Sequence, residues 1–180
     1  MKFNPTSFEG VWLIQLEPRE DDRGSFARTY CEREFAAHGL NTRWVQCNTT
    51  LTRRRGSLRG LHYQAEPFPE IKLIRCTAGR VFDVVVDLRP HSPTFGQHEA
   101  FELSSGRSDQ LYIPGGFGHG FQCLEEECSL FYQMSEFYHP DLARGVRWND
   151  PALGIQWPLA AADVSERDQK LPTLSPIHGD

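Results

Sequence analysis

Short apolar segments, most of them separated by glycine, proline, serine or aspartate, run along the whole chain. Within Arg80–Leu88, Phe82, Val84 and Val86 fall on one face of an extended strand and Asp83 on the other, a period of two that is typical of β-structure. The pattern predicts strands over Val11–Leu16, Thr42–Gln46, Leu58–Gln64, Lys72–Thr77, Arg80–Leu88, Gln97–Leu103, Gln110–Ile113, Gly120–Leu124 and Ser129–Phe137. Such regular short strands predict a mainly β fold, an antiparallel sandwich or barrel.

Few segments are typical of helices. Cys31–His38 is one candidate, with Gly39 as a natural stop. A second short helix is expected near Ser165, where SERD has the serine-to-acid spacing of a capping box. Without repeats or linkers, residues 1–180 are predicted to form a single domain with a short helical C-terminal tail.

Composition narrows the classes of function. The 180 residues carry a formal net charge of −5, which gives no reason to expect a nucleic acid or an anionic membrane as partner. Five cysteines without a CxxC pair suggest free thiols in a reducing compartment. No stretch is typical of a signal peptide or a membrane span, so a cytoplasmic protein is the simplest interpretation.

Histidines raise the question of a metal. Pro114, Gly116 and His119 satisfy the PxGxxH motif of metal-binding cupins, but Gln64 stands where the second histidine of their HxH motif would follow His62. Two histidines are too few, because a catalytic zinc usually has three protein ligands. The pattern therefore favours a cupin scaffold without its metal.

Five ordered blocks make the interpretation specific: EPREDDRGSFARTY (17–30), GSLRGLHYQ (56–64), KLIRCTAGRVFDVVVDLRPHSPTFGQ (72–97), LYIPGGFGHGFQ (111–122) and WNDPALGIQWP (148–158). Together they resemble the dTDP-4-dehydrorhamnose 3,5-epimerase family. The resemblance implies a cupin-type antiparallel jelly-roll barrel, a metal-independent isomerase, and a homodimer to which the N-terminal segment contributes. It also implies a nucleotide-linked 4-keto-6-deoxyhexose as the small-molecule substrate.

The reaction implied by this resemblance has clear chemical requirements. The protons at C3 and C5 of a 4-keto sugar are acidic because the carbanion delocalises onto the C4 oxygen as an enolate. Inversion then needs a base on one face of the sugar, a proton donor on the other, and a cation or hydrogen-bond donor at the oxyanion. No redox cofactor or metal is required.

The resemblance assigns four catalytic groups. His62 is the base, Tyr132 the proton donor and Lys72 the group that stabilises the enolate. Asp168 is expected to orient the His62 ring, as a carboxylate does in a serine-protease triad, with Asp83 as an alternative support. On spacing alone, simpler explanations exist for all four. His62 would be an ordinary strand histidine and Tyr132 a core aromatic, while Lys72 would be a strand-end lysine and Asp168 a helix-cap residue.

Further positions match those that contact the nucleotide-sugar or shape its pocket in the family. Arg23 lies in a segment that is expected to reach the neighbouring site of a dimer. The predicted binding residues are Arg23, Gln46, Asn48, Arg59, His119 and Tyr138.

Some positions depart from the pattern of the family. Arg28 stands where many members have an acidic residue, Gln133 where they have lysine, and His98 where they have tryptophan. The usual glutamine before Lys72 is absent, and Glu70 and Ile71 stand there instead. The exact nucleotide and sugar therefore stay open. The alternatives are an epimerase that acts on one carbon only, a cupin that binds a sugar nucleotide without turning it over and, third, a metal-dependent cupin enzyme.

Overall fold

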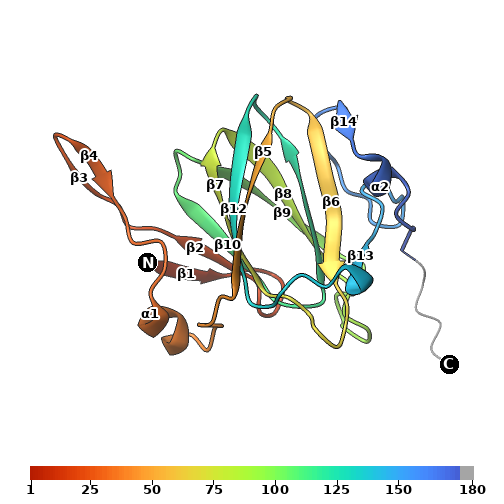
Figure 1. Cartoon of the computed structure of the whole chain (residues 1–180), viewed down its shortest axis with the longest axis horizontal. Coiled ribbons are helices and arrows are strands. Elements are labelled where there is room, and N and C mark those ends of the chain that lie inside the picture. Colours follow the sequence, from red (N-terminus) through yellow and green to blue (C-terminus); the bar gives the residue numbers. More distant parts are fainter. Residues whose placement is uncertain (175–180) are drawn as a thin grey trace.

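Two antiparallel sheets face each other in the computed structural model, which describes residues 1–174 (Figure 1). The first has the order β1-β2-β10-β7-β12-β5 and the second β13-β6-β11-β8-β9, with β14 pairing in parallel to β6. The strands of the first sheet are β1 (Lys2–Pro5), β2 (Trp12–Gln15), β5 (Gln46–Thr52), β7 (Lys72–Ala78), β10 (Asp109–Ile113) and β12 (Cys128–Met134). Those of the second are β6 (Ser57–Gln64), β8 (Arg80–Asp87), β9 (His98–Ser104), β11 (Phe117–Cys123), β13 (Ala143–Gly145) and β14 (Asp163–Val164). The mainly β prediction is confirmed.

Apolar side chains from both sheets meet in the space between them. Ile74 and Leu111 of the first sheet and Val85 and Phe121 of the second belong to one cluster of buried residues. Alternate residues of a strand point to opposite faces, so each sheet contributes every second side chain to this core.

Strand β8 is buried on both faces. Val81 and Val85 lie in the core between the sheets, whereas Val84 and Val86 pack with Val146 on the outer side. The acids of this strand are buried as well. The Asp87 carboxylate accepts hydrogen bonds from the Arg89, Ser92 and Thr94 side chains, which is how a buried charge is tolerated.

Both predicted helices exist, as α1 (Glu32–Ala37) and α2 (Glu166–Gln169), together with the short 3-10 helix η1 (Pro140–Leu142). The Ser165 hydroxyl caps α2 by accepting the Asp168 backbone N–H at 3.1 Å. The predicted strand Thr42–Gln46 is wrong, because residues 41–45 are irregular and strand β5 only begins at Gln46.

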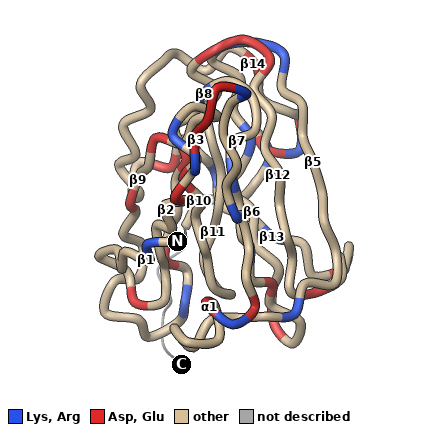
Figure 2. Tube along the Cα trace, turned by 90° about the vertical axis from the view of Figure 1, so that its left-hand side faces the viewer, with Lys and Arg blue, Asp and Glu red and all other residues tan. Residues whose placement is uncertain are grey.

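A two-stranded hairpin, β3 (Arg19–Asp21) with β4 (Gly24–Phe26), projects away from the two sheets (Figure 1). The tube in Figure 2 marks charged residues of both signs along β3. Phe26, at the end of β4, is 77% exposed. Within residues 1–174, none of the helices has the length and hydropathy that crossing a membrane requires.

Candidate active site

A cavity of about 540 Å³ opens between strands β5, β12 and β7 of the first sheet and β6 of the second, and α2 lies beside it. Eight of the ten predicted site residues line it: Gln46, Asn48, Arg59, His62, Lys72, Tyr132, Tyr138 and Asp168. The strands therefore bring together residues that are far apart in the sequence.

The register of the first sheet places one group of these residues in rows. Gln46 pairs with Met134, which in turn pairs with Lys72 across β12. In the next row that faces the cavity, Asn48 pairs with Tyr132. Residues two apart on one strand share a face, so Lys72 and Tyr132 point to the same side of the sheet.

A bulge on β6 aims two basic residues into the same cavity. Arg59 and His62 are three positions apart and would point to opposite faces of a regular strand. The pairs His119–His62 and Phe121–Arg59 show one extra residue on β6, and Gly60 lies within this step with a φ of 126°. Only glycine fits there, because an added Cβ would lie 2.5 Å from the Gly120 Cα.

His62 forms a hydrogen-bonded pair with Asp168. Its Nε2–H donates to Asp168 Oδ1 at 2.7 Å, and Asp168 Oδ2 accepts the Gly60 N–H at 3.2 Å. The His62 side chain is 40% exposed toward the cavity, whereas that of Asp168 is 5% exposed. A proton held on Nε2 leaves Nδ1 with the free lone pair that a base needs.

The environment of Asp168 keeps its carboxyl ionised. Burial by itself raises the pKa of Asp168, but the hydrogen bond and the charge of His62 lower it, together with the Gly60 N–H and Ser165. The net result is a pKa below the ordinary aspartate value. The Asp168 side chain thus contacts His62, and the backbone N–H of the same residue takes part in the helix cap.

Tyr132 faces the cavity from the opposite sheet. Burial raises the pKa of its phenol well above the ordinary value, and the negative charge of Asp83 raises it further. Arg59 and Thr50 act in the opposite direction, with a smaller effect. The phenol is therefore protonated at neutral pH and can donate a proton.

His119 and Asp83 form a second pair, behind Tyr132. His119 Nε2 lies 2.9 Å from Asp83 Oδ2, and both side chains are buried. The rings of His119 and Tyr132 meet edge to face at 6.1 Å. Asp83 thus contacts His119 instead of supporting His62 or facing solvent, and His119 does not line the cavity.

The other predicted residues that line the cavity bind one another or neighbouring side chains of the cavity. Lys72 is 6% exposed, and its ammonium lies 2.6 Å from Glu70 Oε1. Arg59 donates from Nε to the Thr52 hydroxyl at 3.0 Å. The Gln46 amide donates to Asn48 and accepts the Tyr138 N–H.

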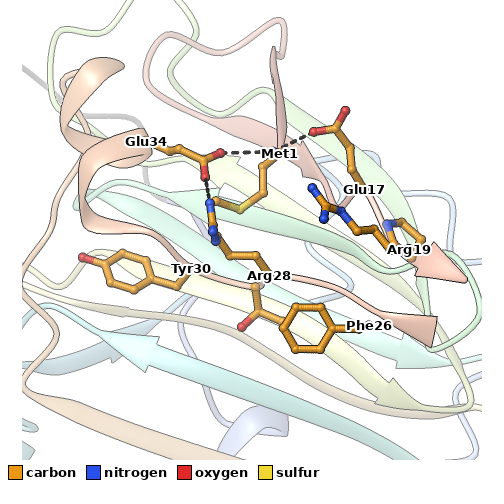
Figure 3. Close-up of a pocket in the computed structure, with 9 residues that line it drawn as sticks. Met1, Glu17, Arg19, Phe26, Arg28, Tyr30 and Glu34 are labelled. Carbon is orange, nitrogen blue, oxygen red and sulfur yellow. Dashed lines mark hydrogen bonds and ion pairs between the residues drawn. The ribbon is translucent and has the colours of Figure 1, made fainter.

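Arg23 lies outside this cavity. Its side chain is 89% exposed on the hairpin and pairs with Asp21 at 2.6 Å. A separate cavity of about 710 Å³ lies near the hairpin (Figure 3), where the Met1 amino group contacts Glu17 and Glu34, and Arg28 pairs with Glu34. None of the predicted catalytic residues lines it.

Sequence reasoning missed several residues that line the cavity. Thr50 and Thr52 continue the face of β5 that carries Asn48, so the period of two from a recognised binding residue was the signal that could have found them. The others are Ser57, Leu58, Glu70, Phe121, Met134, Asp163, Ser165 and Arg167. Within residues 1–174, no three His, Cys, Asp or Glu side chains are grouped so that they could hold a metal ion.

Comparison with known proteins identifies the family. A model of the dTDP-4-dehydrorhamnose 3,5-epimerase family matches residues 5–176. The dTDP-4-dehydrorhamnose 3,5-epimerase of Methanothermobacter thermautotrophicus is 43% identical over 176 residues, which cover 96% of this chain and 94% of the relative. The chain belongs to this family. It is an isomerase of the dTDP-4-dehydrorhamnose 3,5-epimerase type, as the sequence predicted.

Relatives and solved structures of the family give further detail. The dTDP-4-dehydrorhamnose 3-epimerase of Streptomyces niveus is 41% identical over 170 residues, or 94% of this chain and 82% of the relative. The structure of the Bacillus anthracis 3,5-epimerase with TDP and PPi bound matches with a TM-score of 0.94 at 38% identity, over 96% of this chain and 99% of that one. A Legionella pneumophila 3,5-epimerase in complex with dTDP-4-keto-L-rhamnose matches with a TM-score of 0.92 at 35% identity, over 98% and 94%. These matches confirm the cupin-type jelly roll.

Proposed function

We propose that the chain converts dTDP-4-dehydro-6-deoxyglucose to dTDP-4-dehydrorhamnose by inverting C3 and C5, with His62 as base and Tyr132 as proton donor. The hydrogen bond between His62 and Asp168 inside the cavity, across from Tyr132, carries this proposal. The two side chains come from facing sheets, on strands β6 and β12. A sugar ring held between them has the base on one face and the donor on the other, as inversion requires.

The proton transfers balance at each carbon. His62 Nδ1 takes the proton from C3, and the electron pair of the C–H bond moves onto the C4 oxygen as an enolate. Tyr132 then delivers its phenolic proton to the opposite face of C3, and the carbonyl re-forms. Exchange with solvent removes the proton from His62 and returns one to Tyr132, after which the same cycle operates at C5.

Two side chains stabilise the charges that develop. The Lys72 ammonium faces the C4 oxygen and gains most when that oxygen becomes negative, which lowers the barrier instead of merely tightening binding. Asp168 stabilises the imidazolium that forms on His62. Arg59, with its planar guanidinium, binds the phosphates of the nucleotide.

The second part of the proposal is a homodimer in which each hairpin β3–β4 reaches the cavity of the partner subunit. The hairpin projects from its own sheets (Figure 1). The side chains of Phe26 and Arg23 on it are exposed. A contact with a second subunit would bury the Phe26 ring, and aromatic side chains contribute much of the energy of such interfaces. We place the enzyme in the cytoplasm because all five cysteines are free thiols.

Incorporation of solvent deuterium into the substrate tests the reaction. The wild-type enzyme in D2O is expected to label C3 and C5, and His62→Asn is expected to label neither. His98→Asn, on strand β9, serves as the control that changes a histidine outside the cavity. Equal, negligible labelling by wild type and His62→Asn would refute the catalytic role.

The outcome at each carbon also separates the alternatives. Labelling at C3 alone would indicate a 3-epimerase, the activity for which the Streptomyces niveus relative is named. Binding of the substrate without any C–H exchange would indicate a sugar-nucleotide-binding cupin. The pair of His62 with Asp168 favours the catalytic alternatives, because mere binding requires no oriented base.

A further inference from the structure

The cavity holds one ion pair that the reaction scheme leaves without a function, between Glu70 and Lys72. The Lys72 Nζ lies 2.6 Å from Glu70 Oε1. Both side chains are largely shielded from solvent, with 8% exposed for Lys72 and 12% for Glu70. Both line the cavity together with His62 and Tyr132. Charge-assisted hydrogen bonds of this length are among the stronger ones in proteins.

The backbone fixes this pair in place. The Ile71 N–H donates to the Ser135 hydroxyl at 2.8 Å, and the Ile71 carbonyl accepts the Ser135 N–H at 3.0 Å. The Ile71 side chain packs against a buried cluster that includes Leu73 on the other side of the chain. In extended backbone the residues before and after Ile71 share the opposite face, so Glu70 and Lys72 both point into the cavity.

The two cationic side chains of the cavity, Lys72 and Arg59, have different partners. Among the described residues, Glu70 is the acidic partner of Lys72 within ion-pair distance. The Arg59 Nε instead donates to a neutral hydroxyl, that of Thr52. Arg59 thus keeps its full charge for an anionic group of the ligand, whereas the charge of Lys72 is compensated before the substrate arrives.

We propose that Glu70 is a positioning residue that acts through Lys72: its carboxylate fixes the ammonium and sets how much positive charge reaches the C4 oxygen. This inference rests on the proposed function, in which Lys72 stabilises the enolate. As the oxyanion forms, it competes with the Glu70 carboxylate for the same ammonium. The neutral carbonyl of the bound substrate competes far less, so the effect of Glu70 falls on the transition state.

Glu70→Gln tests this directly, because the amide keeps the size and a hydrogen-bond acceptor but removes the charge. We expect kcat for deuterium incorporation at C3 to rise roughly fivefold with KM unchanged, the signature of an interaction made only in the transition state. Glu70→Ala also removes the hydrogen-bond acceptor, so its kcat is expected to be lower than that of Glu70→Gln. Glu66→Gln removes an exposed charge from the same turn, outside the cavity, and is expected to match wild type.

A second set of variants tests whether the effect passes through Lys72. In a Lys72→Met background, Glu70→Gln is expected to leave the exchange rate unchanged relative to Lys72→Met alone. The proposal is overturned by an unchanged or lower kcat in Glu70→Gln, by an equal effect in the Lys72→Met background, or by Glu70→Ala matching Glu70→Gln. Failure of the proposed function looks different, because the wild-type enzyme itself would then show no exchange.

Discussion

Replacing Asp168 with asparagine removes one negative charge. It also leaves one acceptor oxygen where the carboxylate uses two to accept two hydrogen bonds. In the native site, one oxygen accepts from His62 Nε2 and the other from the Gly60 N–H. An amide has a single oxygen, so one of these two donors must face an NH2 group. If the oxygen stays on Gly60, His62 must move its proton to Nδ1, and the lone pair that faces the substrate is lost.

The size of the effect follows from burial and from the role of a base. A buried donor left without an acceptor costs about 1–3 kcal/mol, and the Asp168 side chain is only 5% exposed. General-base catalysis contributes about 10²- to 10⁴-fold. Because His62 is 40% exposed and water can partly replace its partner, we expect a loss of roughly 10²- to 10³-fold in kcat.

The assay is the rate of deuterium incorporation at C3, measured beside the thermal unfolding of each variant. Glu166→Gln is the matched control, because Glu166 is an acid of the same helix and its side chain is 90% exposed. It is expected to retain the wild-type rate. A folded Asp168→Asn variant with a rate within about threefold of wild type would refute the inference that this carboxylate sets the tautomer of His62.

Three further outcomes are expected. Tyr132→Phe removes the donor but leaves the base, so solvent exchange at C3 should continue while inversion, followed by NMR, is lost. Asp87→Asn should lower the free energy of unfolding by about 2 kcal/mol at pH 7. Burial raises the pKa of the Asp87 carboxyl, but its hydrogen-bond donors lower it by more, so that the net pKa is about 2. This contribution is present above the ordinary aspartate pKa and disappears as the pH falls through 2, so urea titrations of the variant and the wild type should converge in acid. Gly60→Ala, whose Cβ would meet the Gly120 Cα at 2.5 Å, should cost about 3 kcal/mol or more of unfolding free energy. The matched change Gly39→Ala should cost only about 1–2 kcal/mol, because φ is 68° there but no other part of the chain lies within 4 Å of the added Cβ.

The strands that alternate apolar and polar residues could be predicted from the sequence, and those whose two faces are both polar could not. Strand β5 was missed beyond Gln46 because one face lines the cavity with Asn48, Thr50 and Thr52, while Cys47 on the other is exposed. Neither face shows the apolar period that marks a strand. The hairpin β3–β4 was missed for the same reason, since its residues are exposed.

Resemblance located the candidate site better than pattern did, but it gave no geometry. It predicted that Asp168 orients His62, but it could not show which ring nitrogen contacts the carboxylate, nor that Asp83 pairs with His119. The contact of Asp83 with His119 depends on how β8 and β11 align in the sheet, and that of Asp168 with His62 depends on where α2 packs against β6. Glu70 and Lys72 lie two positions apart in one extended segment, so the sequence allows them to pair. Only the structure shows that they do and that both line the cavity.

His62 and Asp168, the proposed base and its orienting acid, are 106 positions apart in the chain. During synthesis on the ribosome, both sheets can form while β14 and α2 are still unmade, since only β14 pairs onto the edge of β6. A chain arrested before residue 168 would carry the cavity walls but an unoriented histidine. On the proposed mechanism, proton abstraction therefore depends on a helix that is synthesised after every strand of both sheets.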